Sequence, residues 1–116
     1  MSVELRGSQA LKLWHDVSLS LVRSAEQDLT SRQLTLLLTV YLDTPPHTVK
    51  GLSEKLEITK PAITRALDSL GQMKLLSRKR DPKDRRIVYV TRTVQGAQYL
   101  QELGDMVVKK AALLPT

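Results

Sequence analysis

The sequence contains no cysteine among its 116 residues. Disulfides, thiolate metal ligands, cysteine nucleophiles and thiol redox sensors are therefore excluded. Aromatic side chains are scarce, with one Trp, three Tyr and no Phe. No apolar run approaches the roughly 20 residues needed to span a bilayer. The N-terminal MSVELRGSQ lacks the basic and apolar regions of a secretory signal. We therefore expect a cytoplasmic protein without a membrane partner.

Enzymatic signatures are also lacking. The sequence shows no Gly-rich phosphate loop, no nucleophile elbow and no paired-carboxylate arrangement. His15 and His47 lie far apart and have no partners at metal-ligand spacing, so both are expected at the surface or at helix caps. We expect no enzyme, no cofactor and no metal site.

Positive charge is abundant, and it is concentrated in one segment. The net charge of the chain is +6. Residues 60–92 hold ten basic and three acidic residues, a net charge of +7, which leaves −1 for the rest. Such a local excess is typical of a polyphosphate-binding surface, although a solvated basic face is the alternative.

The spacing of apolar residues predicts five helices in a single domain over residues 1–116. The first, about 9–25, has its stripe at Leu11, Trp14, Val17, Leu21 and Ala25. The second, 30–42, begins with Thr30 and Gln33 in capping-box spacing and stops before two prolines. The third, about 49–56, follows Thr48 as its cap, and the fourth, about 60–70, follows Thr59. The last, about 94–112, follows Thr93.

Between the last two helices the periodicity changes to that of strands. LLSRKR and RIVYVTR flank the turn sequence DPKD, which predicts a hairpin over about 75–92. Two short helices with a tight turn fit a helix-turn-helix over about 48–74, and a hairpin directly after them makes it a winged helix. The expected fold class is therefore mainly α with a small β-hairpin wing.

The fourth helix is the candidate reading element. Ile63, Leu67 and Leu70 are expected to face the core, which leaves an exposed set suited to base edges and phosphates. That set consists of Thr59, Lys60, Pro61, Thr64 and Arg65, with Asp68 beside it. An ordinary amphipathic surface helix is the alternative interpretation.

The hairpin brings Lys79, Arg80, Arg85 and Arg86 together, and like charges at such distances destabilise a fold without an anion. We expect Asp81 and Asp84 to hold the hairpin by pairing with Arg86 or Arg80. Lys83 and Arg85 would then remain at the tip for a minor groove. The predicted DNA-binding residues of the wing are Lys83, Arg85 and Arg86.

The chain resembles the MarR-type transcription regulators over about residues 29–96. DRRIVYVTRTVQG, residues 84–96, is similar to the family's wing and the start of its following helix. LTSRQLTLLLTVYL, residues 29–42, resembles the second helix, and residues 59–81 resemble the recognition helix and the first wing strand. The sequence departs from the family pattern at Gly51 and at Glu57, which would be strained if the helix-turn-helix turn needs positive φ.

The resemblance implies a homodimer on a pseudo-palindromic duplex, with the terminal helices at the interface. Trp14 is expected in the core or in that interface, and an effector pocket around it is an alternative that nothing else in the sequence supports. Two other functions stay open. One is a winged helix that binds an acidic protein, and the other is nonspecific architectural DNA binding.

Overall fold

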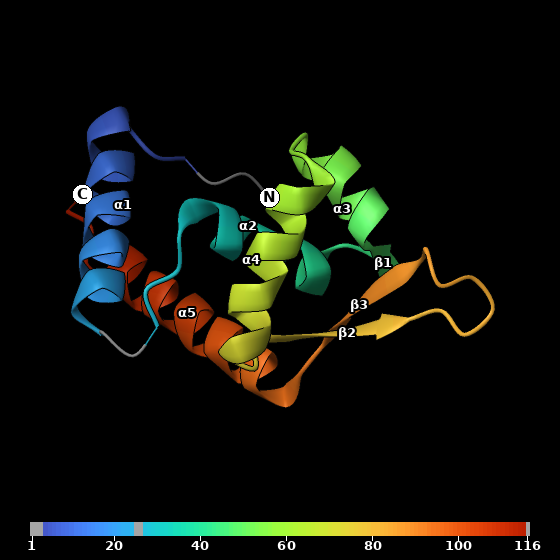
Figure 1. Cartoon of the computed structure of the whole chain (residues 1–116). Helices are drawn as coiled ribbons and strands as arrows, with labels where there is room; N and C mark the ends of the chain where they lie inside the picture. The colour runs from blue at the N-terminus through green and yellow to red at the C-terminus, as the bar shows by residue number, and fades with distance from the viewer. Residues whose placement is uncertain (1–3, 25–26, 116) are drawn as a thin grey trace. The chain divides into compact units, whose positions relative to one another are not determined.

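Five helices and three short strands make up residues 4–24 and 27–115, the part of the chain that the computed structural model describes. Their order confirms the predicted winged-helix fold class (Figure 1). The elements are α1 (Gly7–Arg23), α2 (Ser31–Leu42), β1 (His47–Thr48), α3 (Val49–Leu56), α4 (Lys60–Gln72), β2 (Leu76–Arg80), β3 (Val88–Arg92) and α5 (Val94–Ala112). No helix among these residues has the length and apolar character to cross a bilayer.

The chain divides into two compact units. The first comprises residues 1–28 and 101–116, and the second comprises residues 29–100. The helix-turn-helix and the hairpin fall entirely within the second unit. The single domain over residues 1–116 stays a prediction.

Side-chain caps begin the helices of the second unit where the sequence predicts them. Thr30 and Gln33 form a reciprocal capping box, with N–H to oxygen distances of 2.9 and 3.1 Å. The Thr48 hydroxyl accepts the Gly51 N–H at 3.0 Å, and Thr93 accepts the Gly96 N–H at 2.9 Å. Each cap satisfies an N–H that the first helical turn leaves without a backbone partner.

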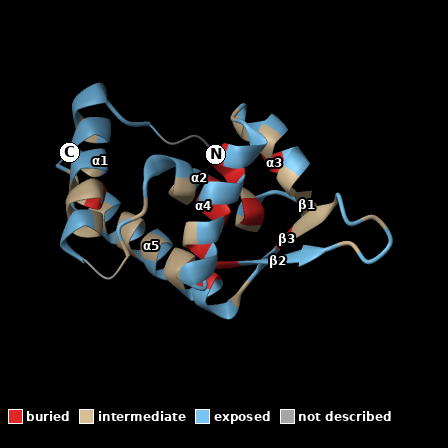
Figure 2. Ribbon diagram, viewed as in Figure 1, coloured by how far each residue is buried: buried red, intermediate tan, exposed pale blue. Residues whose placement is uncertain are grey.

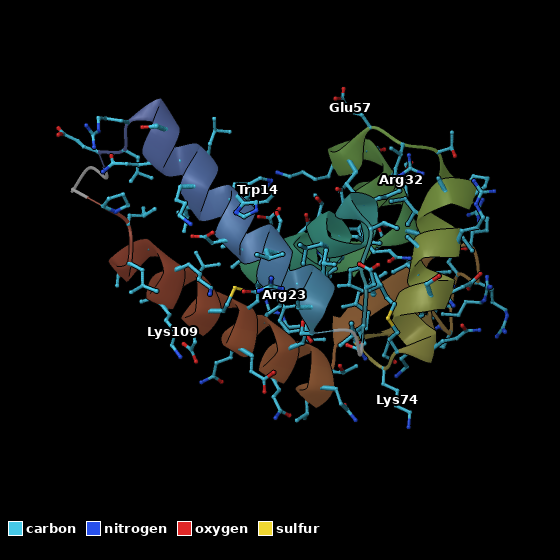
Figure 3. The ribbon with its side chains drawn as sticks, turned by 90° about the vertical axis from the view of Figure 1, so that its left-hand side faces the viewer. Trp14, Arg23, Arg32, Glu57, Lys74 and Lys109 are labelled. Carbon is cyan, nitrogen blue, oxygen red and sulfur yellow. The ribbon has the colours of Figure 1, made fainter. Side chains whose placement is uncertain are left out.

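The turn between α3 and α4 has a left-handed backbone, which is the condition under which Glu57 was expected to be strained. Glu57 has φ 55° and ψ 43°, a region that disfavours side chains with a Cβ. Its side chain is exposed at this turn (Figure 3). The turn keeps this geometry because the Ile58 N–H donates to the Ser53 carbonyl at 3.2 Å, and the Ser53 hydroxyl donates to the Ile58 carbonyl at 2.5 Å.

The sheet has three antiparallel strands in the order β1-β3-β2. The hairpin of β2 and β3 was predicted, and Arg78 lies opposite Val90 in its register. The two-residue β1 was not predicted, because a strand of that length has no periodicity. It pairs His47 with Val90 and Thr48 with Tyr89, so it fastens the start of α3 to the wing.

The hydrophobic core of the second unit lies where α2, α3 and α4 meet the base of the sheet (Figure 2). Ile63, Leu67 and Leu70 of α4 are buried, as the sequence predicts. The wing contributes Leu76 and Val90, and the segment before it contributes Leu75. The hairpin is therefore anchored in the core only at its base.

Tyr41 ties the base of the wing to the start of α5. Its hydroxyl donates to the Thr93 carbonyl at 2.8 Å and accepts the Thr93 N–H at 2.9 Å. Gly96 makes this contact sterically feasible, because a Cβ there would overlap the Tyr41 hydroxyl and the Leu75 carbonyl oxygen. Thr93 also donates its hydroxyl to the carbonyl of Lys74, at 2.7 Å.

The first unit has apolar side chains that stay exposed. On α1, Val17 is buried, whereas Leu11, Trp14 and Val22 are 73%, 68% and 70% exposed. At this exposure Trp14 is not a core residue, and its place in the dimer interface, the other half of the expectation, stays a prediction. Helix α1 spans Gly7–Arg23 rather than 9–25, and Ala25 lies outside the described residues.

Candidate nucleic-acid interface

Helix α4 presents a polar face opposite its core face. Lys60, Pro61, Thr64 and Arg65 are all exposed, which agrees with the predicted direction of these side chains. Thr59 precedes them, and its hydroxyl accepts the Ala62 N–H at 3.3 Å. Thr59 therefore caps the helix, and the other four residues supply the side chains that are free to contact a ligand.

Asp81 shapes the turn of the wing through backbone contacts. Its Oδ1 accepts the N–H groups of Lys83 and Asp84 at 2.7 and 3.0 Å. Its Oδ2 accepts the Tyr89 hydroxyl at 3.3 Å. These bonds, with the Asp84 N–H foremost, lower the pKa of Asp81, and the charged carboxylate raises the pKa of Tyr89.

Asp84 forms the ion pair that the sequence analysis offered as one of two pairings. The Arg86 Nε and Nη2 donate to Asp84 Oδ1 and Oδ2, both at 3.0 Å. This two-pronged contact lowers the pKa of Asp84, and the carboxylate raises the pKa of Arg86. The Arg86 side chain is nevertheless 91% exposed, so an anion can still approach it.

Arg80, the other expected partner, forms no ion pair with Asp81 or Asp84. The Arg80 Nη1 donates instead to the main-chain carbonyl of Arg85, at 2.7 Å. The short wing turn brings this carbonyl within reach, whereas Asp81 is already occupied by two backbone N–H groups. The wing thus holds two of its arginines in internal contacts.

Three wing cations remain exposed with no side-chain hydrogen bond or ion pair within the described ranges 4–24 and 27–115. They are Lys79, Lys83 and Arg85. Lys83 and Arg85 flank Asp84 in the turn beyond the strands. The structure therefore leaves the two predicted tip residues available to a ligand.

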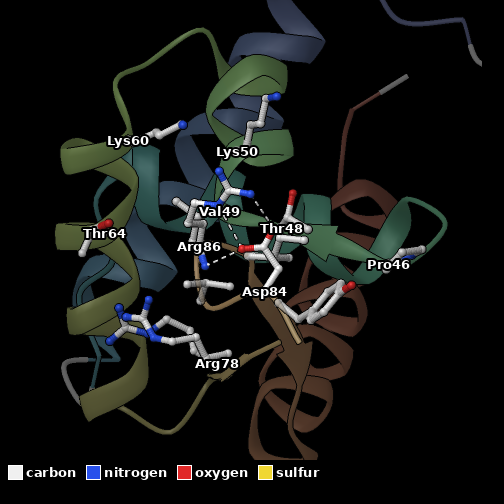
Figure 4. Close-up of a pocket in the computed structure, with 13 residues that line it drawn as sticks. Pro46, Thr48, Val49, Lys50, Lys60, Thr64, Arg78, Asp84 and Arg86 are labelled. Carbon is white, nitrogen blue, oxygen red and sulfur yellow. Dashed lines mark hydrogen bonds and ion pairs between the residues drawn. The ribbon is translucent and has the colours of Figure 1, made fainter. Parts of the chain in front are cut away.

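A cleft of about 1070 Å³ separates α4 from the wing. Figure 4 shows Lys60 and Thr64 entering it from α4, Lys50 from α3, and Arg78 and Arg86 from the wing side. Of the predicted site residues, Lys60, Thr64, Asp84 and Arg86 line this cleft. Thr59, Pro61, Arg65, Asp81, Lys83 and Arg85 do not line it.

Three basic residues that line the cleft were missing from the predicted site, namely Lys50, Arg78 and Arg80. Lys50 follows the cap Thr48, a position that points from the first turn of α3 into the cleft. Arg78 is two residues after the buried Leu76, so the alternation of a strand sends both to the same face. That alternation was visible in the sequence, whereas the ion pair that Arg78 forms with Asp68 of α4 was not.

The arrangement defines a winged helix-turn-helix. A short helix and a tight turn precede a helix with one exposed polar face, and a basic hairpin follows it across a cleft. The family model described as the MarR family matches residues 29–88. The chain therefore belongs to the MarR family and is a MarR-type winged-helix transcription regulator. No sequence among the curated proteins matches it.

Several solved structures share the fold. A mutant of S. aureus MepR is 20% identical with a TM-score of 0.72, and the match covers 91% of this chain and 79% of that one. YusO from Bacillus subtilis is 23% identical with a TM-score of 0.71 and coverages of 93% and 82%. An S. aureus MepR–DNA complex is 22% identical with a TM-score of 0.67 and coverages of 84% and 83%. At these identities the likeness supports the fold alone.

Proposed function

We propose that the chain binds double-stranded DNA sequence-specifically as a homodimer. Helix α4 enters the major groove, and the wing reaches the adjacent minor groove. The observation that carries this proposal is that the exposed polar face of α4 and the basic wing border the same cleft. The MepR structure in complex with DNA adds support from a relative of the same fold.

Arg65 is the proposed base reader of α4. It is exposed on the polar face and has no ion pair among the residues that the structure describes. An Arg in this position can donate two hydrogen bonds to guanine O6 and N7. Lys60, Thr64 and the first turn of α4 would contact phosphates and set the register.

The wing would contribute mainly charge. Lys83 and Arg85 project from the turn, where a narrow minor groove attracts inserted cations. Arg86 would add a phosphate contact while it remains bonded to Asp84. This division gives the helix the sequence preference and the wing the salt dependence.

The proposed dimer uses the exposed apolar residues of the terminal helices. Leu11, Trp14 and Val22 lie on α1, and Val108 and Leu113 lie at the C-terminal end of the chain. A dimer would bring two α4 helices to half-sites about one turn apart, roughly 34–36 Å. The duplex should therefore be pseudo-palindromic.

The experiment that tests base reading is selection from a pool of random duplexes with the parent protein and with Arg65→Ala. The parent should enrich a pseudo-palindromic motif. The variant should lose preference at one position per half-site, at a cost of about 1–3 kcal/mol. Arg32→Ala is the control, because it removes an exposed Arg at the start of α2.

Identical motifs from the parent and Arg65→Ala would mean that Arg65 reads no base. Retention of duplexes without any enriched motif would favour architectural binding. Failure to retain duplexes at low salt would favour the protein-interaction alternative.

A further inference from the structure

An ion pair joins the recognition helix to the first strand of the wing. Arg78 Nη2 of β2 donates to Asp68 Oδ1 of α4 at 2.6 Å. We infer that Asp68 and Arg78 are positioning residues that hold the wing at a fixed angle to α4, so that the two contact DNA as one preformed unit. This inference rests on the proposed DNA binding.

The pair connects β2 of the wing to α4, whereas the pairing with β1 holds β3. Arg78 shares its strand face with the buried Leu76, which directs its side chain toward α4. Beyond Arg78, the side chain of Arg80 and the N–H of Asp81 bond only within the hairpin, to Arg85 and Ile87. Arg78 is therefore the last point of β2 with a bond back to the helix.

No other ion pair in the described ranges links α4 to the wing. The remaining pairs lie within α1, between Lys55 and Asp43, and within the wing turn between Arg86 and Asp84. The Asp68–Arg78 pair is also partly shielded, with the Arg78 side chain 34% exposed and that of Asp68 56% exposed. A partly covered, short contact restricts the motion of the wing relative to α4 more than a fully solvated one does.

The charges explain why a carboxylate is tolerated on this face. Asp68 is the only acidic residue of α4, and it lies beside Thr64 and Arg65 on the exposed surface. Alone it would repel phosphate, whereas paired with Arg78 it adds no net charge. The pair thus gives up one phosphate-binding Arg in return for a fixed geometry.

An ordered wing lowers the conformational entropy that binding must remove. Loss of the pair should therefore reduce the ratio of specific to nonspecific affinity. A partly exposed pair of this kind changes such ratios by about two- to fivefold. Overall stability should change little, because the core does not include either side chain.

The test uses Asp68→Asn, Arg78→Gln and the exchanged pair Asp68→Arg with Arg78→Asp. Binding is measured by anisotropy on the selected duplex and on a scrambled duplex. Asp68→Asn should bind scrambled DNA more tightly, because Arg78 is released, and Arg78→Gln should bind it more weakly. Both should lower the specificity ratio by about two- to fivefold, and the exchanged pair should restore it.

Asp43→Asn is the matched control. It breaks the Asp43–Lys55 ion pair, whose atoms lie 3.6 Å apart, and makes the same change in net charge as Asp68→Asn. The specificity ratio of this variant should stay at the parent value. An equal fall in the control, a fall confined to Arg78→Gln, or no restoration by the exchanged pair would overturn the inference.

A second readout does not depend on DNA. Amide hydrogen exchange over residues 79–88 of the free protein should be faster in Asp68→Asn than in Asp43→Asn, at equal unfolding midpoints. Equal exchange would overturn the inference. If the parent binds no duplex, the proposed function fails, and the exchange result alone decides whether the pair positions the wing.

Discussion

Glu57 and Gly96 are the single residues whose backbone and size constrain this fold most. Glu57 sits in the left-handed region, which costs a residue with a Cβ about 1–2 kcal/mol. At Gly96 the absence of a Cβ leaves room for the Tyr41 hydroxyl. A Cβ is therefore unfavourable at both positions, but only position 96 has a glycine.

Glu57→Gly should raise the free energy of unfolding by about 0.5–1 kcal/mol. Glycine relieves the left-handed strain, and its greater freedom in the unfolded chain offsets part of the gain. Urea unfolding measures the difference. Glu57→Ala is the control, because Ala retains the Cβ and should give no comparable gain. Equal stabilities of the Gly and Ala variants would contradict the proposed strain.

Gly96→Ala should lower the free energy of unfolding by about 1–3 kcal/mol, because the new methyl forces Tyr41 and the base of the wing apart. Gly104→Ala provides the comparison within the same helix. No atom lies within 4 Å of a Cβ there, so the helix should gain about 1 kcal/mol. Stabilisation by both substitutions would mean that the Tyr41 contact is not tight in solution.

At the scale of elements, the wing is a hairpin with a buried base and a charged tip. Its internal bonds occupy Arg80 and Arg86, whereas Lys79, Lys83 and Arg85 remain without side-chain partners in the described part of the chain. Some cations of this tight turn therefore stabilise the turn itself, and the others stay available to a ligand.

Lys83→Ala with Arg85→Ala should flatten the salt dependence of duplex binding. Each phosphate contact that is lost removes about 0.9 from the slope of log affinity against log salt concentration. Anisotropy titrations across a salt series measure this slope. Lys109→Ala with Lys110→Ala removes the same charge from the end of α5 and should leave the slope closer to the parent value. Equal slopes in the parent and the wing variant would contradict the proposed role of Lys83 and Arg85 in phosphate binding.

Much of the second unit could be predicted from sequence because its signals are local. The caps Thr30, Thr48, Thr59 and Thr93 act within three residues, and the change of period at the hairpin needs no partner to be seen. The exposed face of α4 followed from helical geometry alone. These local signals were enough to assign the predicted site residues to α4 and to the wing.

The contacts that escaped prediction join residues far apart in the chain. The Asp68–Arg78 pair depends on how β2 crosses α4, and the Arg80 contact depends on the path of the turn. Strand β1 exists only because β3 offers it a free edge. No local pattern of charge or hydrophobicity carries this information.

At the scale of the whole molecule, two surfaces call for partners. One is the basic segment with a net charge of +7 inside a chain of +6. The other is the exposed apolar stripe of α1, where Leu11, Trp14 and Val22 recur on one helical face. A DNA-bound dimer would cover both.

Leu11→Ser with Trp14→Ser should shift the protein from dimer to monomer in sedimentation at micromolar concentration. Loss of a buried Trp at an interface centre costs about 2 kcal/mol or more, which weakens association at least about thirtyfold. Arg23→Ser is the control, because Arg23 lies on α1 outside the apolar stripe. A parent protein that sediments as a monomer would contradict the dimer.

The most direct measurement is an anisotropy titration of the parent protein on its selected duplex and on a scrambled duplex, repeated across a salt series. Sequence-specific binding predicts an affinity ratio of about 1000 or more, retained as salt weakens both complexes. Equal affinities with a steep salt slope would leave only architectural DNA binding, and no binding at low salt would contradict the account as a whole.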